Sequence, residues 1–444
     1  NTTWLFPCLI FYIPAQVRSL GLWDRMLLVP KTAASAKNRF IWYPDRLNQL
    51  PSSLSGLPKL LRLPVMKGII PELLRDLRTP SRFFRPKSES PAEVERKARR
   101  ELLEDESVES FITRRNRGSK LAQNVISAVI HGIYAGDIRR LSVRSLLGFL
   151  WETERTHGSL MRRFLMPTWL NSRYRPPCPE QVALKQWEGK ALDKAKGLLG
   201  PEAIEQIKKI SVYSFPQGVQ ELTDAMMEEL RSAENVEVQT GVSCEAVTLN
   251  QDQSIEITTS SGKITCSRVI SALPATVLND RLSPQLPSNY LTGGAMATVG
   301  VVNLAIPSWL YAPRPRLLSI EGFGFLVPRS VQPNKDGILG IVFDSDSITE
   351  QDYAPNGTAE TGPTKFTVMM GGAHWQDLSK DQLPGEEKMI AAAKKAVSKC
   401  LGVEMKLLDD PGTMVRAKMQ YDCIPWYTVG HPVRMARLHR AILD

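Results

Sequence analysis

The sequence predicts a mixed α+β or α/β protein, with an antiparallel sheet and a separate block of helices. Four short apolar runs predict the sheet, because each is rich in β-branched or aromatic residues and is bounded by Pro, Gly, Asp or Ser. They are residues 298–306, 322–327, 338–343 and 366–370. Helical periodicity over much of residues 91–198 predicts the helices. With 444 residues, 43% of them hydrophobic, the chain is long enough for two or three domains.

The first fifty residues predict a short helix, a strand and a β-hairpin. Residues 17–30 have the pattern of a short helix that leads into a strand. Charged and aromatic residues alternate over 37–43, Pro44-Asp45 supplies a turn, and the chain returns over 47–50. The apolar stretch at 4–13 is too short to cross a bilayer as a helix, and it lacks the features of a signal peptide.

Residues 51–120 combine leucine with basic residues. Leucines recur between 54 and 77, with Lys and Arg between them, and Phe83-Phe84 lies between two arginines. A basic amphipathic element suits a membrane surface, and it suits equally a helix packed on its own domain. Nucleic acid is disfavoured as a partner because the basic residues alternate with leucine and not with stacking aromatics.

The remaining elements follow in chain order. Helices are expected over 91–112, 121–133 and 141–161, with a break at the prolines of 176–179. Further along, the patterns predict a helix over 218–230, strands at 236–238, 254–259 and 263–270, a helix over 385–401 and a strand over 414–421.

Charge and side-chain chemistry restrict the function. The net charge of +10 favours an anionic partner. The six cysteines include no CxxC pair, and the five histidines form no HExxH motif, so no metal site is predicted. The cysteines are expected to be reduced thiols inside a cell. A structural role is expected for His374.

The segment from Gly322 to Pro328 suggests an apolar slot. Two glycines flank Phe323 and remove the Cβ atoms that would keep a flat ligand from the backbone. The later run of Met369, Met370, Gly371 and Gly372 adds thioethers and open backbone. An ordinary sheet core with glycines at bulges explains the same pattern. Arg39, between aromatic residues, suits a carboxylate, although an ordinary exposed strand arginine fits as well.

Several segments, in this order, resemble the protoporphyrinogen oxidases, flavoenzymes of the flavin amine-oxidase superfamily. The similarity extends from about Val17 to about Ala436. The matching segments are Asn38-Arg-Phe40, His131-Gly-Ile-Tyr-Ala-Gly-Asp137, Glu154-Arg-Thr-His-Gly-Ser159, Ile270-Ser-Ala-Leu-Pro-Ala275, Gly322-Phe-Gly-Phe-Leu-Val-Pro328, Val368-Met-Met-Gly-Gly372 and Ile424-Pro-Trp-Tyr-Thr-Val-Gly-His431.

This resemblance implies a flavin amine-oxidase-like fold with a substrate-binding sheet, a helical membrane-associating domain and an incomplete FAD-binding domain. The implied ranges are 1–33 for an incomplete N-terminal part, 34–200 for the helical basic domain, 201–280 for the remaining FAD-binding part, 281–424 for the substrate sheet and 425–444 for a truncated C-terminal part. The implied reaction is the oxygen-dependent, six-electron oxidation of protoporphyrinogen IX to protoporphyrin IX in haem biosynthesis.

The resemblance also implies roles for individual residues. Arg39 would bind a propionate, Gly324 would leave room at the ring, and apolar side chains would line the slot: Val129, Ile133, Phe323, Leu326 and Met369. No catalytic side chain is implied, since hydride would pass to the flavin. Cys244 and Ala272 would contact FAD. Peripheral attachment to the mitochondrial inner membrane, ferrochelatase as a partner and a homodimer are further expectations.

The sequence departs from the family at both ends. The Gly-x-Gly-x-x-Gly turn that binds the pyrophosphate and the C-terminal FAD segment are absent, and residues 1–16 resemble nothing in the family. We therefore expect a truncated chain that binds FAD weakly or not at all.

Two alternative functions stay open at this point. One is another flavin amine oxidase with an aromatic cage at Trp426-Tyr427, and the other is a non-catalytic porphyrin- or membrane-binding remnant.

Overall fold

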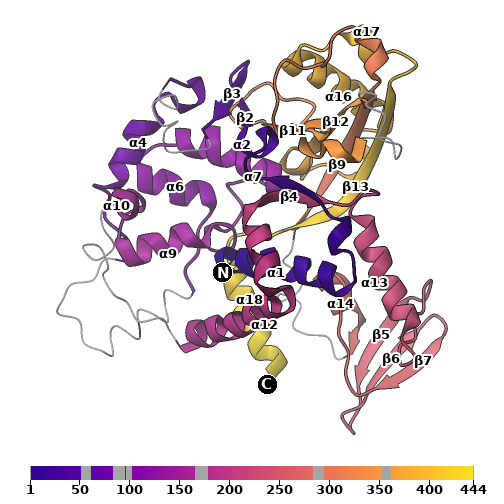
Figure 1. Ribbon diagram of the computed structural model, residues 1–444. Helices are drawn as coiled ribbons and strands as arrows, with labels where there is room; N and C mark the ends of the chain where they lie inside the picture. Colours follow the sequence, from indigo (N-terminus) through magenta and orange to yellow (C-terminus); the bar gives the residue numbers. More distant parts are fainter. Residues whose placement is uncertain are drawn as a thin grey trace.

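The computed structural model describes residues 2–51, 62–83, 96, 103–165, 179–283, 295–352 and 362–443. Figure 1 shows a block of helices at the left, a large sheet at the upper right and a small sheet at the lower right. Within the described residues, no helix combines the length and apolar character that crossing a bilayer requires.

The large sheet has seven strands in the order β13-β9-β12-β11-β10-β2-β3. Every neighbouring pair is antiparallel except β10 and β2, which are parallel. The four predicted apolar runs are confirmed as strands, and so is the N-terminal hairpin. The bounds are β2 Arg39–Trp42, β3 Leu47–Leu50, β9 Ala295–Ile306, β10 Gly324–Leu326, β11 Ile338–Phe343, β12 Thr364–Gly371 and β13 Met414–Trp426.

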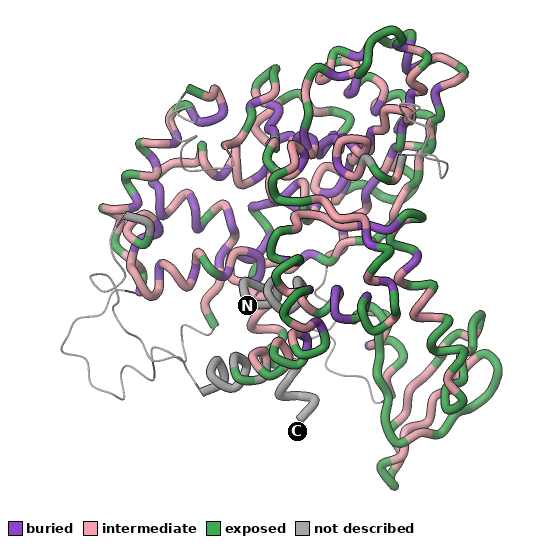
Figure 2. The backbone as a smooth tube through the Cα atoms, viewed as in Figure 1, coloured by how far each residue is buried: buried purple, intermediate pink, exposed green. Residues whose placement is uncertain are grey.

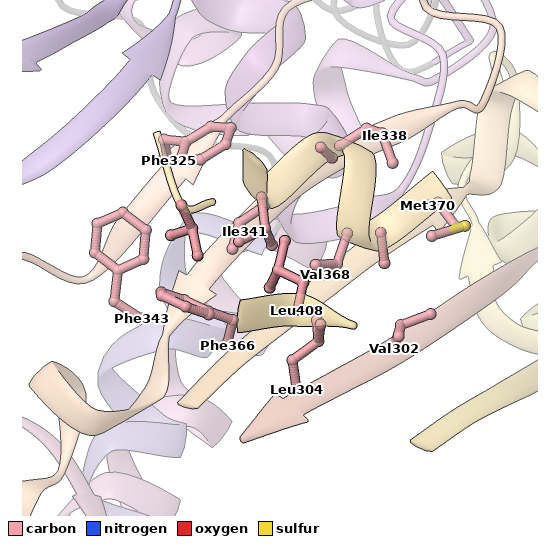
Figure 3. Close-up of a cluster of buried hydrophobic side chains, with 14 of the residues drawn as sticks. Val302, Leu304, Phe325, Ile338, Ile341, Phe343, Phe366, Val368, Met370 and Leu408 are labelled. Atoms are coloured by element: carbon pink, nitrogen blue, oxygen red, sulfur yellow. The ribbon is translucent and has the colours of Figure 1, made fainter. Parts of the chain in front are cut away.

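One face of this sheet forms the main core. Alternate side chains of the strands point to this face, as the two-residue period of a strand requires, and they pack beneath α16 (Glu386–Leu401) and α17 (Met405–Leu408). Figure 3 shows Phe325, Phe343, Phe366 and Val368 in this cluster. The rings of Phe343 and Phe366 meet edge to face with centroids 6.1 Å apart, a favourable aromatic geometry.

Helices cover part of the opposite face. A second core joins the helical block to the sheet and contains Phe111, Ile130 and Trp151 from helices together with Val299 from β9. The helices are α4 Ile69–Asp76, α6 Val108–Asn116, η4 Ala122–Ile126, α7 Ser127–Tyr134, α8 Val143–Leu146, α9 Gly148–His157 and α10 Leu160–Leu165. The helix predicted over 141–161 is therefore broken into three pieces.

A buried ionic network holds these helices together. Arg115 on α6 and Asp76 on α4 are both fully buried, and their charged groups are 2.6 Å apart. Arg115 also reaches the Glu154 carboxylate on α9 and donates to the carbonyl oxygen of Gly158. Ser159 donates to Asp76. The Glu154–Ser159 segment thus ties three helices at one point, which gives it a structural role.

Longer helices form a third group near the termini. α1 (Thr2–Ser19) packs along α12 (Pro179–Lys209), which is kinked at Gly200, and α18 (His431–Leu443) lies nearby (Figure 1). The predicted short helix at 17–30 is instead the end of α1, followed by η1 (Trp23–Arg25) and the expected strand β1 (Leu27–Pro30), which pairs with β4 (Ile210–Ser214). The short elements are α2 Ala34–Lys37, η3 Pro64–Met66, η5 Ser308–Leu310, α15 Asp344–Ser347, η6 Thr349–Asp352, η7 Gly372–His374 and η8 Lys380–Gln382.

The small sheet has the order β7-β6-β5-β8 and carries no buried residue on β5, β6 or β7, as Figure 2 shows. No strand forms at 236–238, and the predicted strand over 263–270 stops at Cys266, so those two expectations are wrong. Neither segment pairs with a strand within the part of the chain that the structure describes, and Ile270 is 99% exposed. The bounds are α13 Gln220–Ser232, β5 Cys244–Leu249, β6 Ile255–Thr259, β7 Gly262–Cys266, α14 Ala275–Arg281 and β8 Leu282–Ser283.

Two predicted domain ranges differ from this architecture. The hairpin of β2 and β3 is part of the large sheet and not of a helical domain that begins at residue 34. Strand β13 continues to Trp426, beyond the predicted end of the substrate sheet at 424. Half of the residues of the helix predicted over 91–112 lie outside the described residues, and in the described part residues 103–107 are not helical and α6 begins only at Val108. The leucines between 54 and 61 and the prolines at 176 and 177 also lie outside the described residues.

Candidate functional site

Four of the segments that resemble the protoporphyrinogen oxidases meet at helix α7. The carbonyl oxygen of Tyr134 accepts a hydrogen bond of 3.0 Å from the indole Nε1 of Trp426. The carbonyl oxygen of Ala135 accepts one of 2.7 Å from the backbone N–H of Ala373. His131 Nδ1 donates to the carbonyl oxygen of Val327 at 3.2 Å. The segments at 131–137, 322–328, 368–374 and 424–431, distant in sequence, are therefore neighbours in space.

Glycines at these contacts allow the close approach. A Cβ on Gly132 would come within 2.3 Å of Leu326 Cδ2, and one on Gly372 within 2.1 Å of the carbonyl oxygen of Ala135. Gly372 also has φ +55°, a conformation that L side chains rarely adopt. Helix α7 can therefore lie directly against β10 and the end of β12.

One side of α7 faces away from the core. Val129, Gly132 and Ile133 have the i, i+3 and i+4 spacing that places residues on one helix face. Gly132 touches Leu326, while Ile133 is 56% exposed. An exposed isoleucine beside a strand contact indicates a surface that is available to an apolar ligand.

The sheet contributes a matching row of side chains. Ile41, Leu326, Gly340 and Met369 lie directly opposite one another across β2, β10, β11 and β12. Residues in register share a face of the sheet. Gly340 lets β11 lie close to β10, because a Cβ there would lie 2.4 Å from the carbonyl oxygen of Phe325. Leu326 and Met369 are both partly exposed. Of the predicted slot residues, Leu326 and Met369 thus share a face of the sheet, and Leu326 lies against Gly132 of α7, the helix that carries Val129 and Ile133.

Arg39 stands at the edge of this face. It is opposite Gly324 in the parallel pairing of β2 with β10, and its Cζ lies 5.6 Å from the centroid of the Phe323 ring. A guanidinium over an aromatic face gains cation–π attraction and stays planar and ordered. Arg39 is exposed and forms no ion pair with any described carboxylate. It is therefore free to bind an anionic group of a ligand.

The glycines that flank Phe323 have a different role from the one predicted. A Cβ on Gly324 would lie 2.2 Å from the carbonyl oxygen of Ile341, and one on Gly322 would lie 2.7 Å from the carbonyl oxygen of Asn38. The space at both positions is occupied by the neighbouring strands. Gly324 therefore permits strand pairing, and the expectation that it leaves room for a ligand ring is corrected. Gly132 and Gly340 likewise allow close packing, of α7 against Leu326 and of β11 against β10.

Two buried histidines lie behind α7. The rings of His131 and His374 have centroids 5.6 Å apart, and His131 is only 3% exposed. Burial lowers the pKa of His131 to about 4 and also lowers the pKa of His374. Both rings are therefore neutral at neutral pH and act as packing groups, in line with the structural role expected for His374.

The comparisons with known proteins agree with this arrangement. The model of the flavin containing amine oxidoreductases matches residues 11–436. The chain belongs to that family. Curated relatives include the protoporphyrinogen oxidases of Schizosaccharomyces pombe, 31% identical over 424 residues, and of Bos taurus, 28% identical over 416 residues. These alignments cover 94% of this chain and 73% or 74% of the relatives.

A solved structure shows the same fold. It comes from Exiguobacterium sp. 255-15 and is described as a candidate protoporphyrinogen oxidase. The two chains superpose with a TM-score of 0.61 at 18% sequence identity, and the match covers 96% of this chain and 76% of the other. The flavin amine-oxidase-like architecture expected from the sequence is confirmed.

FAD is the cofactor that membership of the flavin containing amine oxidoreductases implies. Cys244 begins β5 and Ala272 lies in an exposed segment, with the apolar side chains of Val236, Ile270 and Leu273 also exposed. Such a surface suits the flat rings of a nucleotide. Phosphates, however, need a cradle of backbone N–H groups at a glycine-rich turn, and the sequence contains no Gly-x-Gly-x-x-Gly. These residues therefore fit the cofactor in part.

Proposed function

We propose that this flavin-containing oxidoreductase acts on protoporphyrinogen IX, oxidising it to protoporphyrin IX with oxygen as the acceptor. The observation that carries the proposal is the open face between α7 and the large sheet. It combines the exposed Ile133 and partly exposed apolar side chains with the guanidinium of Arg39 at its edge, and it belongs to a chain whose curated relatives include protoporphyrinogen oxidases. The substrate matches this surface, because it has an apolar macrocycle for the apolar side chains and carboxylate groups for the guanidinium.

The chain's own residues bind and orient the substrate. Ile133 and Val129 from the helix, with Leu326 and Met369 from the sheet, would contact the ring through dispersion and exclude water from it. Arg39, held over Phe323, would bind a propionate through paired N–H donors. FAD, when bound, supplies the redox chemistry. None of these binding residues is an acid or base, so the protein acts here by positioning.

The test is oxygen consumption and porphyrin fluorescence on addition of protoporphyrinogen IX, with and without added FAD. The proposal predicts porphyrin formation above the spontaneous rate that depends on enzyme concentration and on FAD. No enzyme-dependent rate at saturating FAD would refute it. A parallel gel filtration after incubation with FAD shows how firmly the flavin is held.

A second candidate is a non-catalytic protein that binds tetrapyrroles. The observation that favours it is the sheet of β5, β6 and β7, on which no residue is buried, together with the partial fit to FAD. This candidate predicts porphyrin binding without any FAD-dependent oxidation in the same assay.

The structure does not favour an amine oxidase with an aromatic cage at 426–427. Trp426 is 3% exposed, and its indole N–H donates to the backbone of Tyr134. Tyr427 stacks on His431 with ring centroids 4.5 Å apart. The Trp426 ring therefore packs against α7 and the Tyr427 ring against α18, so neither ring is available to form the wall of a cage.

We also propose that the helical block rests on an anionic membrane surface. Leu74 on α4 is 52% exposed and is followed by Arg75, with Arg78 one turn further. Exposed leucine with flanking cations is typical of interfacial binding. Flotation with vesicles of phosphatidylcholine, with and without cardiolipin, tests this, and Leu74→Ser should weaken it. Location on the mitochondrial inner membrane, ferrochelatase as a partner and a homodimer stay predictions, as do the domain ranges.

A further inference from the structure

A pocket that opens to solvent lies on the far side of the large sheet from Arg39. Its volume is about 190 Å³, and it is lined by α16, the loop over 331–336 and the ends of β2, β10 and β11. Arg39 and Leu326 point to the α7 face, whereas Trp42 and Val327 belong to the main core beneath α16. A ligand here would therefore be separated from the proposed substrate face by the sheet itself.

The floor of the pocket is apolar. It is formed by Trp42, Val327, Ile338 and Ala396, each less than 9% exposed. These side chains are fixed by the core that they help to build, so the floor is preformed. Small-molecule sites are typically concave and apolar with a few polar groups, although most are larger, roughly 300–1,000 Å³.

The rim carries three ammonium groups. Lys335 comes from the loop, and Lys395 and Lys399 come from α16. All three are exposed, and within the described residues none of them forms an ion pair. Lys395 and Lys399 have i, i+4 spacing, at which like charges on a helix repel each other. An anion placed between them relieves that repulsion.

The other polar groups of the lining are not alternative binding groups for an anion. The amide of Asn334 is occupied, since it donates to the carbonyl oxygen of Ile338 and accepts from the same residue's N–H, both at 2.9 Å. Burial raises the pKa of the Cys400 thiol to about 11, so the thiol is neutral at physiological pH. Asp336 contributes the one carboxylate of the lining against three cations.

We propose that this pocket binds a small carboxylate with an apolar body, such as a medium-chain fatty acid. The apolar part would lie on Trp42, Val327 and Ile338, and the carboxylate would lie between the ammonium groups of Lys395 and Lys399. The combination of a buried apolar floor and an unpaired basic rim selects this class over neutral or cationic ligands. The limited volume selects short chains over long ones.

The experiment is a titration of the full chain with sodium octanoate, followed by calorimetry and by saturation-transfer NMR. We expect dissociation in the millimolar range or tighter, and we expect octan-1-ol to bind at least about fivefold more weakly because it lacks the charge. Lys395→Gln/Lys399→Gln should weaken octanoate binding about five- to tenfold. Its matched control, Lys388→Gln/Lys418→Gln, removes two exposed charges elsewhere and should have no effect.

Two further variants locate the ligand. Ala392→Phe fills the pocket and should abolish binding, whereas Ala391→Phe, at the exposed neighbouring position of α16, should not. Arg39→Gln should leave octanoate binding unchanged, which separates this site from the proposed substrate face. The inference is overturned if octanoate fails to bind at about 5 mM, or if octan-1-ol binds equally well. It is equally overturned if Ala392→Phe binds as the wild type does, or if Arg39→Gln abolishes binding.

Discussion

The guanidinium of Arg39 lies over the ring of Phe323, with Cζ 5.6 Å from the ring centroid. The parallel pairing of β2 with β10 creates this contact, because it sets Arg39 opposite Gly324, next to Phe323. The ring restricts the rotation of the long arginine side chain, so less conformational entropy is lost when an anion binds. The same register carries the apolar row from Ile41 to Met369 on the same face.

Replacing Arg39 should weaken substrate binding more than turnover. A hydrogen bond to a charged group contributes about 1.5–3 kcal/mol, which corresponds to roughly a ten- to hundredfold increase in KM for Arg39→Gln. The propionate is remote from the reacting carbon atoms, so kcat should change less. Steady-state kinetics with protoporphyrinogen IX at saturating FAD provide the measurement. Arg46→Gln, an exposed arginine between β2 and β3, is the control, and equal effects of the two changes would contradict the assignment.

Alanine at Gly132 should destabilise the contact between α7 and β10. The new Cβ would lie 2.3 Å from Leu326 Cδ2, and overpacking of this kind costs about 1–3 kcal/mol. Urea unfolding should show that loss of stability. Gly197→Ala in α12 is the matched control, because nothing lies within 4 Å of its Cβ and alanine favours the helix by up to about 1 kcal/mol. A stabilised Gly132→Ala variant would show that α7 does not press on β10.

Breaking the buried pair of Asp76 and Arg115 should cause a large loss of stability. Asp76→Asn removes the nearer of the two buried carboxylates that pair with the fully buried Arg115, at 2.6 Å, and such changes cost about 3–5 kcal/mol. Thermal unfolding measures the effect. Glu205→Gln, which removes an exposed partner of Lys208, should leave the melting temperature unchanged. If Asp76→Asn unfolds at the wild-type temperature, the network does not hold α4, α6 and α9 together.

Acidification should destabilise the fold through His131. Its pKa is about 4 in the folded chain, where burial disfavours the charged ring, and 6.5 in the unfolded chain. Below pH 6.5 the unfolded chain binds a proton that the folded chain does not, so stability falls as the pH drops toward 4, by about 2 kcal/mol at pH 5. Nearby His374, Asp137 and Arg329 face the same ring and modify the size of the effect.

Urea unfolding at pH 7.5 and pH 5, each held to about 0.1 unit, measures that loss. His131→Gln should remove the part that His131 contributes, and NMR of the wild type should show that the His131 signal, identified by its loss in His131→Gln, does not titrate between these pH values. An unchanged pH dependence in His131→Gln, together with a His131 signal that titrates near 6.5, would contradict this account.

Much of the large sheet could be predicted from local pattern alone. The β-branched runs at β9, β11 and β12 and the Pro44-Asp45 turn specify strands and a hairpin without reference to the rest of the chain. The segments at 236–238 and 267–270 have the same composition but form no strand, since a strand needs a partner and neither segment has one among the described residues.

The candidate site was predictable as a set of residues but not as a geometry. Arg39, Phe323 and Met369 were expected to line one slot. Register places Arg39 and Met369 on one face of the sheet, and Phe323 contacts Arg39, while their role in binding stays a prediction. The role of Gly324 was misjudged, because a sequence does not show whether the space beside it is filled by Ile341 of the next strand. The hydrogen bond from Trp426 to Tyr134 could not be predicted either, since it joins residues that are 292 positions apart.

The most direct test of the account compares protoporphyrin IX with its dimethyl ester, in which both propionates are capped. Fluorescence titration of the wild type and of Arg39→Gln gives four dissociation constants. The account predicts that the wild type binds the free acid at least about tenfold more tightly than the ester, and that Arg39→Gln largely removes this difference. Equal affinity of the wild type for acid and ester, or a preference that survives in Arg39→Gln, would contradict it.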